Sequence, residues 1–600
     1  MASLKSVYDV VIVGGGHNGL VSASYLAKAG LSVCLLERRH VLGGAAVTEE
    51  IIPGFQFSRA SYLLSLLRPH IYSDLELKKH GLKLLTRDPR SYTPLSPDKW
   101  TKDARSLTLG SDQKKNYQQI AQFSVKDAEN FQKYETYIEE ITQVLDPLFD
   151  IAPHDLGNLL SKRVSLVEKL ALVYNNHHIR QYAYNLLTRR AEMASIYSLL
   201  TSSAHSILSA WFESEPLKAT LLTDGLIGAM VSPHSPSTSY VLLHHVMGGV
   251  DGEKGTWAYP QGGMGAVSGA LATAARAYGA ELFTGQTVSQ ITLDSDHKAS
   301  GVVTSEGVEI KAQYVLSNAT LRNTLLDMIP DGTLDEKVTQ AVQSIDYASP
   351  VTKINVALKS IPNFLSDPNP SQNSIQPHHQ ASIHLNCEHM QDVIDAYQDA
   401  AQGKPSKRPM IEMVLPSSLD STLSPPGHHV CLLFTQFTPY RLNSNRDWTE
   451  EENQIKTFSK EDKQKSSYTN IEWTQEGNTL SDSRDSRDWT PNDKESYAQR
   501  VFNNIDQYCP GFSSDIVGYE ILTPPDLEKE FGLTGGNIFH GALSLSQLLF
   551  NRPLPNFTPS SPFTPVPHLL LCGSGAHPGG GVCGAPGYIA AQMVKRLVKK

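Results

Sequence analysis

The feature that most constrains the fold is a glycine motif near the N-terminus. Residues 10–13 are an apolar, β-branched run with the length of a buried parallel strand. A G-x-G-x-x-G motif made of Gly14, Gly16 and Gly19 follows, and after it apolar residues recur at helical spacing. A second apolar strand then ends at Glu37. This order of strand, glycine turn, helix and strand predicts the βαβ unit of a dinucleotide-binding domain.

Each residue of the motif has a physical role in such a unit. Gly14 permits the tight turn between strand and helix, and Gly19 lets the helix pack closely on the strands. Gly16 has no Cβ, so the backbone can approach a pyrophosphate, which the free N–H groups at the start of the helix attract. Glu37 is placed to accept hydrogen bonds from a ribose. A glycine turn in a βαβ unit that binds nothing is the alternative interpretation.

The same stretch resembles, position by position, the ADP-binding fingerprint of FAD enzymes with the glutathione-reductase fold. Gly43 and Gly44 match a glycine doublet that lies near the diphosphate in those enzymes, and this doublet favours FAD over NAD. Many of those relatives carry an arginine directly after the doublet, where this chain has Ala45 and Ala46. Arg59 is the candidate for the role of that arginine.

The length, composition and net charge of the chain limit the class of protein to which it can belong. Six hundred residues exceed what one core supports, so two domains, or one domain with a large insertion, are expected. The composition is that of a soluble globular protein, and a net charge of −9 without a basic cluster argues against nucleic acid as a partner. No apolar run reaches the roughly 18 residues that predict a transmembrane helix. Only seven residues precede Tyr8, too few for a signal or transit peptide.

The cysteines and histidines predict neither a redox pair nor a metal site. The six cysteines are scattered and form no C-x-x-C, which suits a reducing compartment. Pairs of adjacent histidines occur, as at His177 and His178, but neighbouring side chains diverge on a strand or helix and chelate poorly. We therefore expect no bound metal.

These patterns predict an α/β fold, a glutathione-reductase-type FAD-binding Rossmann domain with a discontinuous α+β substrate or cap domain. The expected order along the chain is FAD-binding at 1–75, mainly helical substrate or cap at 76–250, FAD-binding at 251–330, substrate at 331–560 and FAD-binding at 561–600. Residues 447–488 are polar and poor in aliphatic side chains, which predicts a disordered insertion within the substrate domain.

Three regions are expected to surround the flavin. In FAD-linked oxidases of this fold the segment after the glycine doublet passes beside the flavin, which makes Arg59 and Tyr62 candidate catalytic residues; a helix face in the core is the alternative for this segment. The glycine-dense loop 573–584 aims N–H groups at the flavin pyrimidine edge, where His577 is a candidate to stabilise the reduced anion or relay a proton. Bracing of the loop is the alternative role of His577. Tyr259 is a candidate wall of the substrate tunnel.

The predicted cofactor-binding residues come from the N-terminal motif, the C-terminal loop and one strand between them, whose backbone bonds adenine in the families that this block resembles. They are Gly14, Gly16, His17, Asn18, Gly19, Glu37, Arg38, Gly43, Gly44, Val288, Gly573, Gly580, Gly581 and Val582.

Residues 11–44, 259–265 and 573–584 together resemble the phytoene desaturase-like branch of FAD amine-oxidase-type flavoproteins. The resemblance implies an FAD-dependent oxidoreductase that takes hydride from an organic substrate, apolar or amine-like, onto the flavin, and a regulatory role in mitochondrial function. No second strand–GxGxxG–helix unit exists for NAD(P)H, so the electrons are expected to come from the substrate. An FAD-containing binding or regulatory protein with little turnover is the alternative.

Finer stretches, among them 211–221 and 522–548, resemble an animal subgroup of this branch whose members are assigned to the mitochondrial matrix. The matrix is therefore the expected location, and the cytoplasm is the alternative because no transit peptide is visible. The expected partners are a small-molecule substrate and no nucleic acid, with peripheral contact to a membrane or to an inner mitochondrial membrane protein. The oligomeric state is left open.

Overall fold

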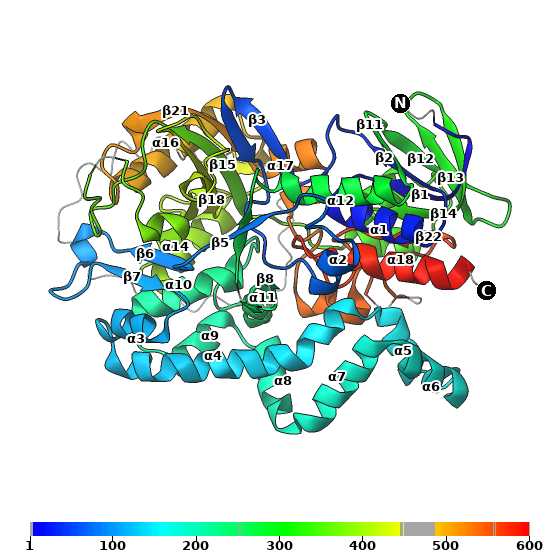
Figure 1. Cartoon of the computed structure of the whole chain (residues 1–600), viewed down its shortest axis with the longest axis horizontal. Helices are drawn as coiled ribbons and strands as arrows, with labels where there is room; N and C mark the ends of the chain where they lie inside the picture. Colours follow the sequence, from blue (N-terminus) through cyan, green and yellow to red (C-terminus); the bar gives the residue numbers. More distant parts are fainter. Residues whose placement is uncertain are drawn as a thin grey trace.

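Two β-sheets lie side by side in the structure, and a row of helices runs below both of them in the view of Figure 1. This computed structural model describes residues 4–250, 253–254, 256–371, 373–444, 448, 486–555, 557 and 560–598. The insertion predicted at about 447–488 falls almost entirely outside the described residues.

Three separate parts of the chain build the first sheet, which carries the glycine motif. β1 (Val7–Val13) pairs in parallel with β2 (Val33–Glu37) and with β14 (Glu309–Ser317), and β22 (Leu569–Leu571) pairs with β14. The strand order is β11 (Glu281–Thr284), β2, β1, β14, β13 (Ala299–Thr304) and β12 (Val288–Leu293). Aliphatic side chains of the parallel strands pack against α1 (His17–Lys28), α12 (Gly265–Ala277) and α18 (Ala585–Val598), which explains why these strands read as continuous apolar runs. The predicted α/β Rossmann fold is confirmed.

The second sheet is mostly antiparallel and is built from strands within residues 91–109 and 351–522. Its order is β21 (Ile516–Leu522), β15 (Val351–Leu358), β18 (His429–Gln436), β17 (Met410–Val414), β16 (Ser382–Leu385), β6 (Ser91–Pro94) and β7 (Ser106–Leu109). α16 (Pro491–Asp506) packs its apolar stripe against this sheet. Thr490 begins α16 with a capping box, because its hydroxyl accepts from the N–H of Asp493 while the Asp493 carboxylate accepts from the N–H of Thr490.

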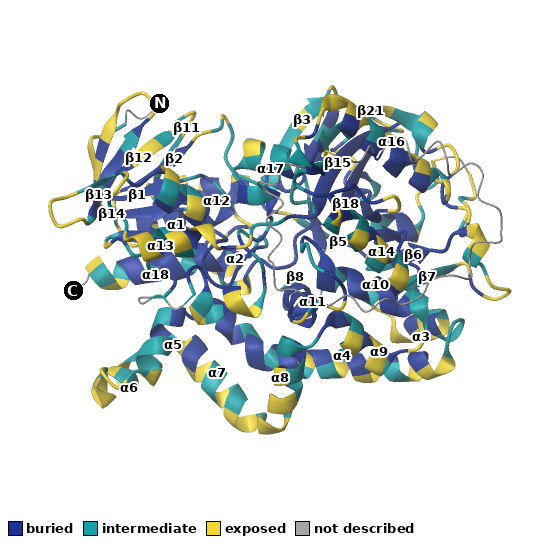
Figure 2. Ribbon diagram, turned by 180° about the vertical axis from the view of Figure 1, so that it is seen from behind, coloured by how far each residue is buried: buried dark blue, intermediate teal, exposed yellow. Residues whose placement is uncertain are grey.

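The helical row follows β7. It consists of α3 (Gln113–Ala121), α4 (Val125–Leu145), α5 (Pro153–Leu160), α6 (Leu166–Asn175), α7 (His177–Thr188), α8 (Met193–Thr201), α9 (Ala204–Trp211), α10 (Glu215–Leu226) and α11 (Thr238–Val246). Ser124 caps α4, and the apolar side chains at helical spacing in α4 are buried. Within the region 76–250, predicted to be mainly helical, the helical row begins only at α3, since residues 84–109 supply β5 (Leu84–Thr86), β6 and β7. Figure 2 shows that the outer members, α6 to α8, carry many exposed residues.

Candidate active site

A cavity of about 670 Å³ reaches from the first sheet to the second, a size typical of ligand-binding pockets. One end is lined by the turn after β1, the end of β2, the start of β12 and the C-terminal glycine loop. The other end is lined by β15 and β18, and α17 (Pro524–Phe531) contributes to the wall. The cavity therefore joins the dinucleotide-binding motif to the interior of the substrate domain.

Most predicted cofactor-binding residues line this cavity. They are Gly14, Gly16, His17, Asn18, Glu37, Arg38, Gly44, Val288, Gly581 and Val582. The remaining four, Gly19, Gly43, Gly573 and Gly580, are not among the lining residues. A Cβ built on any of these four would lie 2.4 to 2.7 Å from a backbone atom, of the same turn for Gly19 and Gly43 and of a distant segment for Gly573 and Gly580, so these glycines permit the close chain approaches that shape the turn and loop.

The glycine turn is shaped to receive a diphosphate. Gly14 has φ +96°, which only glycine adopts without strain, and Asn318 donates from its side-chain amide to the Gly14 carbonyl at 3.3 Å. A Cβ on Gly16 would meet that same Asn318 amide at 2.7 Å. The first turn of α1 carries no carboxylate, and the free N–H groups at such a helix N-terminus favour the binding of an anion.

Glu37 lines the cavity and also accepts hydrogen bonds from neighbouring backbone N–H groups. One carboxylate oxygen accepts from the N–H of Gly15 at 2.7 Å and the other from the N–H of Arg39 at 2.9 Å. The Glu37 carbonyl accepts from the N–H of Gln286, two residues before Val288, at 2.8 Å. These hydrogen bonds hold the motif, β2 and the segment before β12 together at this end of the cavity.

Buried polar atoms without partners test whether this end fits FAD. His17 Nε2, Asn18 Oδ1 and His540 Nδ1 are buried, belong to residues that line the cavity, and have no hydrogen-bond partner among the described residues. Burial lowers the pKa of His17 to about 4, so its ring is neutral and can donate or accept. Unpaired polar atoms in an interior are costly unless a ligand satisfies them. Together with the glycine turn, they fit FAD.

His577 does not line the cavity. Its Nε2–H donates to the Leu148 carbonyl at 2.7 Å, and its backbone N–H donates to the Ser561 hydroxyl at 3.1 Å. Burial lowers the pKa of this imidazole to about 4, so it is neutral at working pH. The geometry favours the bracing role, in which His577 ties the C-terminal loop to the helical row.

We therefore expect His577→Ala to lower the free energy of unfolding by about 1–3 kcal/mol, because the Leu148 carbonyl loses its donor inside the protein. The flavin midpoint potential should remain that of the wild type. Urea unfolding and a redox titration of the purified protein measure the two quantities. A lowered potential with unchanged stability would instead support the proton-relay role predicted from the sequence.

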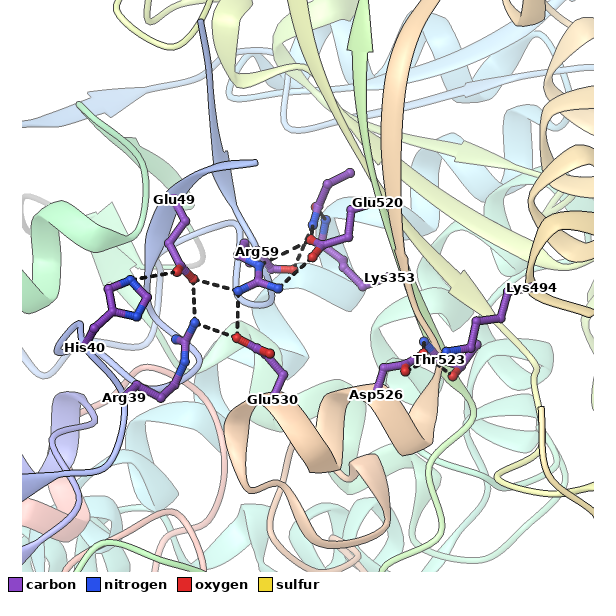
Figure 3. Close-up of polar contacts among 11 residues, drawn as sticks. Arg39, His40, Glu49, Arg59, Lys353, Lys494, Glu520, Thr523, Asp526 and Glu530 are labelled. Carbon is purple, nitrogen blue, oxygen red and sulfur yellow. Dashed lines mark hydrogen bonds and ion pairs between the residues drawn. The ribbon is translucent and has the colours of Figure 1, made fainter. Parts of the chain in front are cut away.

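Arg59 is engaged in an ion-pair network beside the cavity (Figure 3). Its guanidinium contacts Glu49 at 2.9 Å, Glu530 at 2.8 Å and Glu520 at 2.6 Å, and Arg39 contacts Glu49 and Glu530 at 2.8 and 2.7 Å. Although burial opposes the charge, the carboxylates raise the pKa of Arg59 above its usual value. The network ties β3 (Thr48–Ile52) and β21 to the C-terminal end of α17.

Arg38 adds a second tie between the cofactor end and α17. Its guanidinium donates to the carbonyls of Lys529 and Glu530 at 2.9 and 2.8 Å, which satisfies the end of that helix. Since Glu528, Lys529 and Phe531 line the cavity, this clasp of Arg38, Arg39, Arg59, Glu49 and Glu530 holds one wall in place.

Loosening the clasp should weaken cofactor retention. We expect Glu530→Gln to raise the dissociation constant for FAD by about 3- to 10-fold, because two partly buried charge-assisted contacts to α17 are weakened. Glu336→Gln, at an exposed position in α13 (Glu336–Gln343), is the matched control. Fluorescence titration of apoprotein with FAD measures both, and equal affinities for the two variants would contradict the role of the clasp.

The other two candidates from the sequence lie in different places. Tyr62 lines the cavity, where its ring packs at 5.7 Å from that of Phe434. Tyr259 is 1% exposed in an apolar cluster and is not among the lining residues. Burial raises the pKa of both phenols, so both are protonated at working pH.

A lysine that the sequence reasoning missed lies at the substrate end. Lys353 on β15 lines the cavity, is 1% exposed, and makes no ion pair among the described residues. Its Nζ donates to Asn355 Oδ1 at 2.7 Å and lies 5.4 Å from the Tyr62 ring centre. Burial lowers the pKa of Lys353 to about 7. The available signal was a lone lysine within an otherwise uncharged strand, residues 351–358.

Asn355 fixes the orientation of this lysine. Its side-chain N–H groups donate to the Arg59 carbonyl at 3.2 Å and to Glu520 at 3.0 Å, which leaves its oxygen facing Lys353. The backbone carbonyl of Arg59 therefore helps to orient Asn355 toward Lys353, while the Arg59 guanidinium belongs to the clasp.

One group among the described residues has the spacing of metal ligands, formed by His70, Asp150 and His178. Both carboxylate oxygens of Asp150 accept from the Arg68 guanidinium, at distances down to 2.7 Å. A guanidinium already neutralises this carboxylate, so the arrangement is that of an ion pair flanked by two neutral imidazoles, whose pKa values burial lowers.

Comparisons with known proteins identify the family to which the chain belongs. The model of the flavin-containing amine oxidoreductase family matches residues 101–406, and that of an NAD(P)-binding Rossmann-like domain matches residues 12–75. The chain therefore belongs to the flavin-containing amine oxidoreductase family and is an FAD-dependent oxidoreductase.

Individual relatives cover nearly the whole chain. Pyridine nucleotide-disulfide oxidoreductase domain-containing protein 2 of Rattus norvegicus is 48% identical over 99% of this chain and 94% of its own length. The phytoene desaturase (lycopene-forming) of Pantoea ananas is 22% identical over 97% of this chain and 97% of its own. The solved structure of cyclohexylamine oxidase from Brevibacterium oxydans superposes with a TM-score of 0.53 at 14% identity, covering 99% of this chain and 100% of that one. The last likeness supports the fold.

Proposed function

We propose that this enzyme oxidises an apolar or amine-like organic substrate by removing a hydride at the end of the cavity that Lys353 faces. The observation that carries the proposal is Lys353 itself, a buried amine that makes no ion pair among the described residues and faces an apolar chamber. When bound, FAD supplies the hydride acceptor. His17, Asn18, Glu37 and the glycine turn would hold it.

The walls of the substrate end support substrate positioning and exclusion of water. Tyr62, Ile227, Trp257, Val351 and Phe434 present aromatic and aliphatic surface there. Such walls bind an uncharged substrate by apolar contact and disfavour a charged one, so an amine would bind productively as the free base. The names phytoene desaturase and cyclohexylamine oxidase are consistent with apolar and amine substrates respectively.

Lys353 would handle the proton that leaves with the hydride. In its neutral form, which a pKa near 7 makes available, the amine accepts a proton from a substrate or a water at Nζ. Asn355 holds the amine toward the cavity throughout. The chain needs no second nucleotide, in agreement with the single G-x-G-x-x-G motif.

The test is an anaerobic substrate screen of the FAD-loaded protein. We expect bleaching of the visible flavin absorbance by members of a panel of apolar alkenes and primary or secondary amines, and none at a useful rate by NADPH or NADH. Fast reduction by NADPH would refute the proposal. Reduction by no compound in a broad metabolite pool would favour the alternative, an FAD-containing binding or regulatory protein.

A further inference from the structure

Exposed apolar side chains are concentrated on one projecting part of the molecule. Nine of the nineteen large apolar residues that the described chain exposes lie between 160 and 197, on and around α6, α7 and the start of α8. Figures 1 and 2 show α6 at the outer end of the helical row, and α7 and α8 as an open V that projects from the row. We call residues 160–197 the helical apron.

α6 has the sequence of a core helix without the burial of one. Its ten residues, LVEKLALVYN, include none that is buried. Leu166, Val167 and Leu170 are 72%, 76% and 60% exposed. By contrast, most apolar residues of α4, among them Phe131, Ile138 and Ile141, are buried. Contiguous exposed apolar surface of this kind marks a site of interaction.

The apron is basic although the chain is acidic. It carries six basic residues, Lys162, Arg163, Lys169, Arg180, Arg189 and Arg190, and two acidic ones, Glu168 and Glu192. The net charge of the whole chain is −9. Basic residues interleaved with exposed aliphatic ones give a surface that attracts an anionic, apolar partner.

The helical apron also exposes three tyrosines. Tyr174, Tyr184 and Tyr197 are 80%, 67% and 71% exposed. Tyrosine combines an apolar ring with a polar hydroxyl and is favoured at the boundary between lipid headgroups and acyl chains.

We propose that the helical apron binds the surface of an anionic lipid bilayer, with α6 lying in the interface. A second copy of the chain would be a poor occupant, because a two-fold interface through this face would bring together two surfaces that both carry net positive charge. No helix among the described residues is long and apolar enough to span a membrane, so the contact proposed is peripheral. This inference is independent of the substrate proposed above.

The proposal is tested by co-sedimentation of the FAD-loaded full chain with vesicles. Vesicles of phosphatidylcholine alone are compared with vesicles that also contain phosphatidylglycerol. We expect binding to the anionic vesicles, weakened by salt. The charge variant Arg163→Glu/Lys169→Glu should lower the partition coefficient by on the order of tenfold or more. The apolar variant Leu166→Gln/Leu170→Gln should lower it to a similar extent, since two exposed leucines no longer enter the interface.

Matched controls separate the apron from a general effect of charge or polarity. Lys102→Glu/Lys337→Glu changes two exposed lysines elsewhere, and Val308→Gln/Val517→Gln changes two valines that are 41% and 46% exposed. Both controls should bind as the wild type does. All variants should retain FAD and the wild-type melting temperature, because no substituted side chain is buried.

Two results would overturn the proposal. One is failure of the wild type to sediment with anionic vesicles, or sedimentation of the apron variants equal to that of the wild type. The other is a wild-type dimer by light scattering that the apolar variant converts to a monomer, without any vesicle binding, which would assign the apron to a second copy of the chain.

Discussion

Gly16→Leu is expected to give folded but colourless protein. The Cβ of residue 16 would lie 2.7 Å from the Asn318 side-chain amide, which can shift, but the rest of the leucine would fill the place where the backbone must approach the diphosphate. Loss of that approach removes the N–H contacts of α1, so FAD should be absent after purification even with excess FAD. The flavin spectrum and circular dichroism of the same sample measure cofactor and fold separately.

Gly269→Leu is the matched control for Gly16→Leu. Gly269 lies within α12, and a Cβ there would meet nothing within 4 Å. This variant should be yellow, with one FAD per chain. Wild-type amounts of FAD in Gly16→Leu would contradict the assignment of this end of the cavity, and an unfolded Gly16→Leu would be replaced in the test by Gly16→Ala.

Lys353→Met is expected to slow flavin reduction by about 10²- to 10⁴-fold once a substrate is found, because a positioned proton acceptor is lost. In the wild type the rate should rise with pH up to about 7, as Lys353 becomes neutral, and then level off. The variant should lack this rise. Lys359→Met, at an exposed position just after β15, should keep the wild-type profile.

Stability gives a readout of Lys353 that needs no substrate. The folded-state pKa, about 7, lies below the unfolded value of 10.5, so burying a charged amine costs the folded protein stability below pH 7. That cost declines as pH rises from 7 and vanishes above 10.5. Lys353→Met should therefore be more stable than the wild type by about 2–4 kcal/mol at about pH 6 and equal to it at high pH. Equal stability at the lower pH would show that the amine is not desolvated.

The sequence predicted the Rossmann part of the fold well because its signals are local. A β-branched run, a glycine turn and apolar residues at helical spacing, all within about forty residues, determine one βαβ unit. Positions of the turn where two backbone segments come close require glycine. Hence ten of the predicted cofactor residues line one cavity. Gly19, Gly43, Gly573 and Gly580 were chosen by the same motifs but serve chain packing in this structure.

The reactive side of the cavity was less accessible to prediction. His577 was selected for its place in a glycine loop, yet the direction of its side chain depends on helical residues far away in sequence, where the Leu148 carbonyl accepts its hydrogen bond. Arg59 was expected near the ring, and its partners Glu520 and Glu530 lie more than 450 residues away. Lys353 belongs to no sequence motif, because a single lysine in a strand becomes a candidate functional residue only when the structure shows that it is buried.

The sequence by itself determined that this chain folds around a dinucleotide-binding unit, since close backbone approach and helix-dipole geometry are encoded within one short segment. Only the tertiary structure decided which titratable side chains face the cavity, because desolvation and ion pairing depend on neighbours brought together from distant segments. Lys353 loses its hydration where β15 meets Tyr62, and its pKa falls. Arg59 gains three carboxylates, from β3, β21 and α17, and its charge helps to hold these elements together.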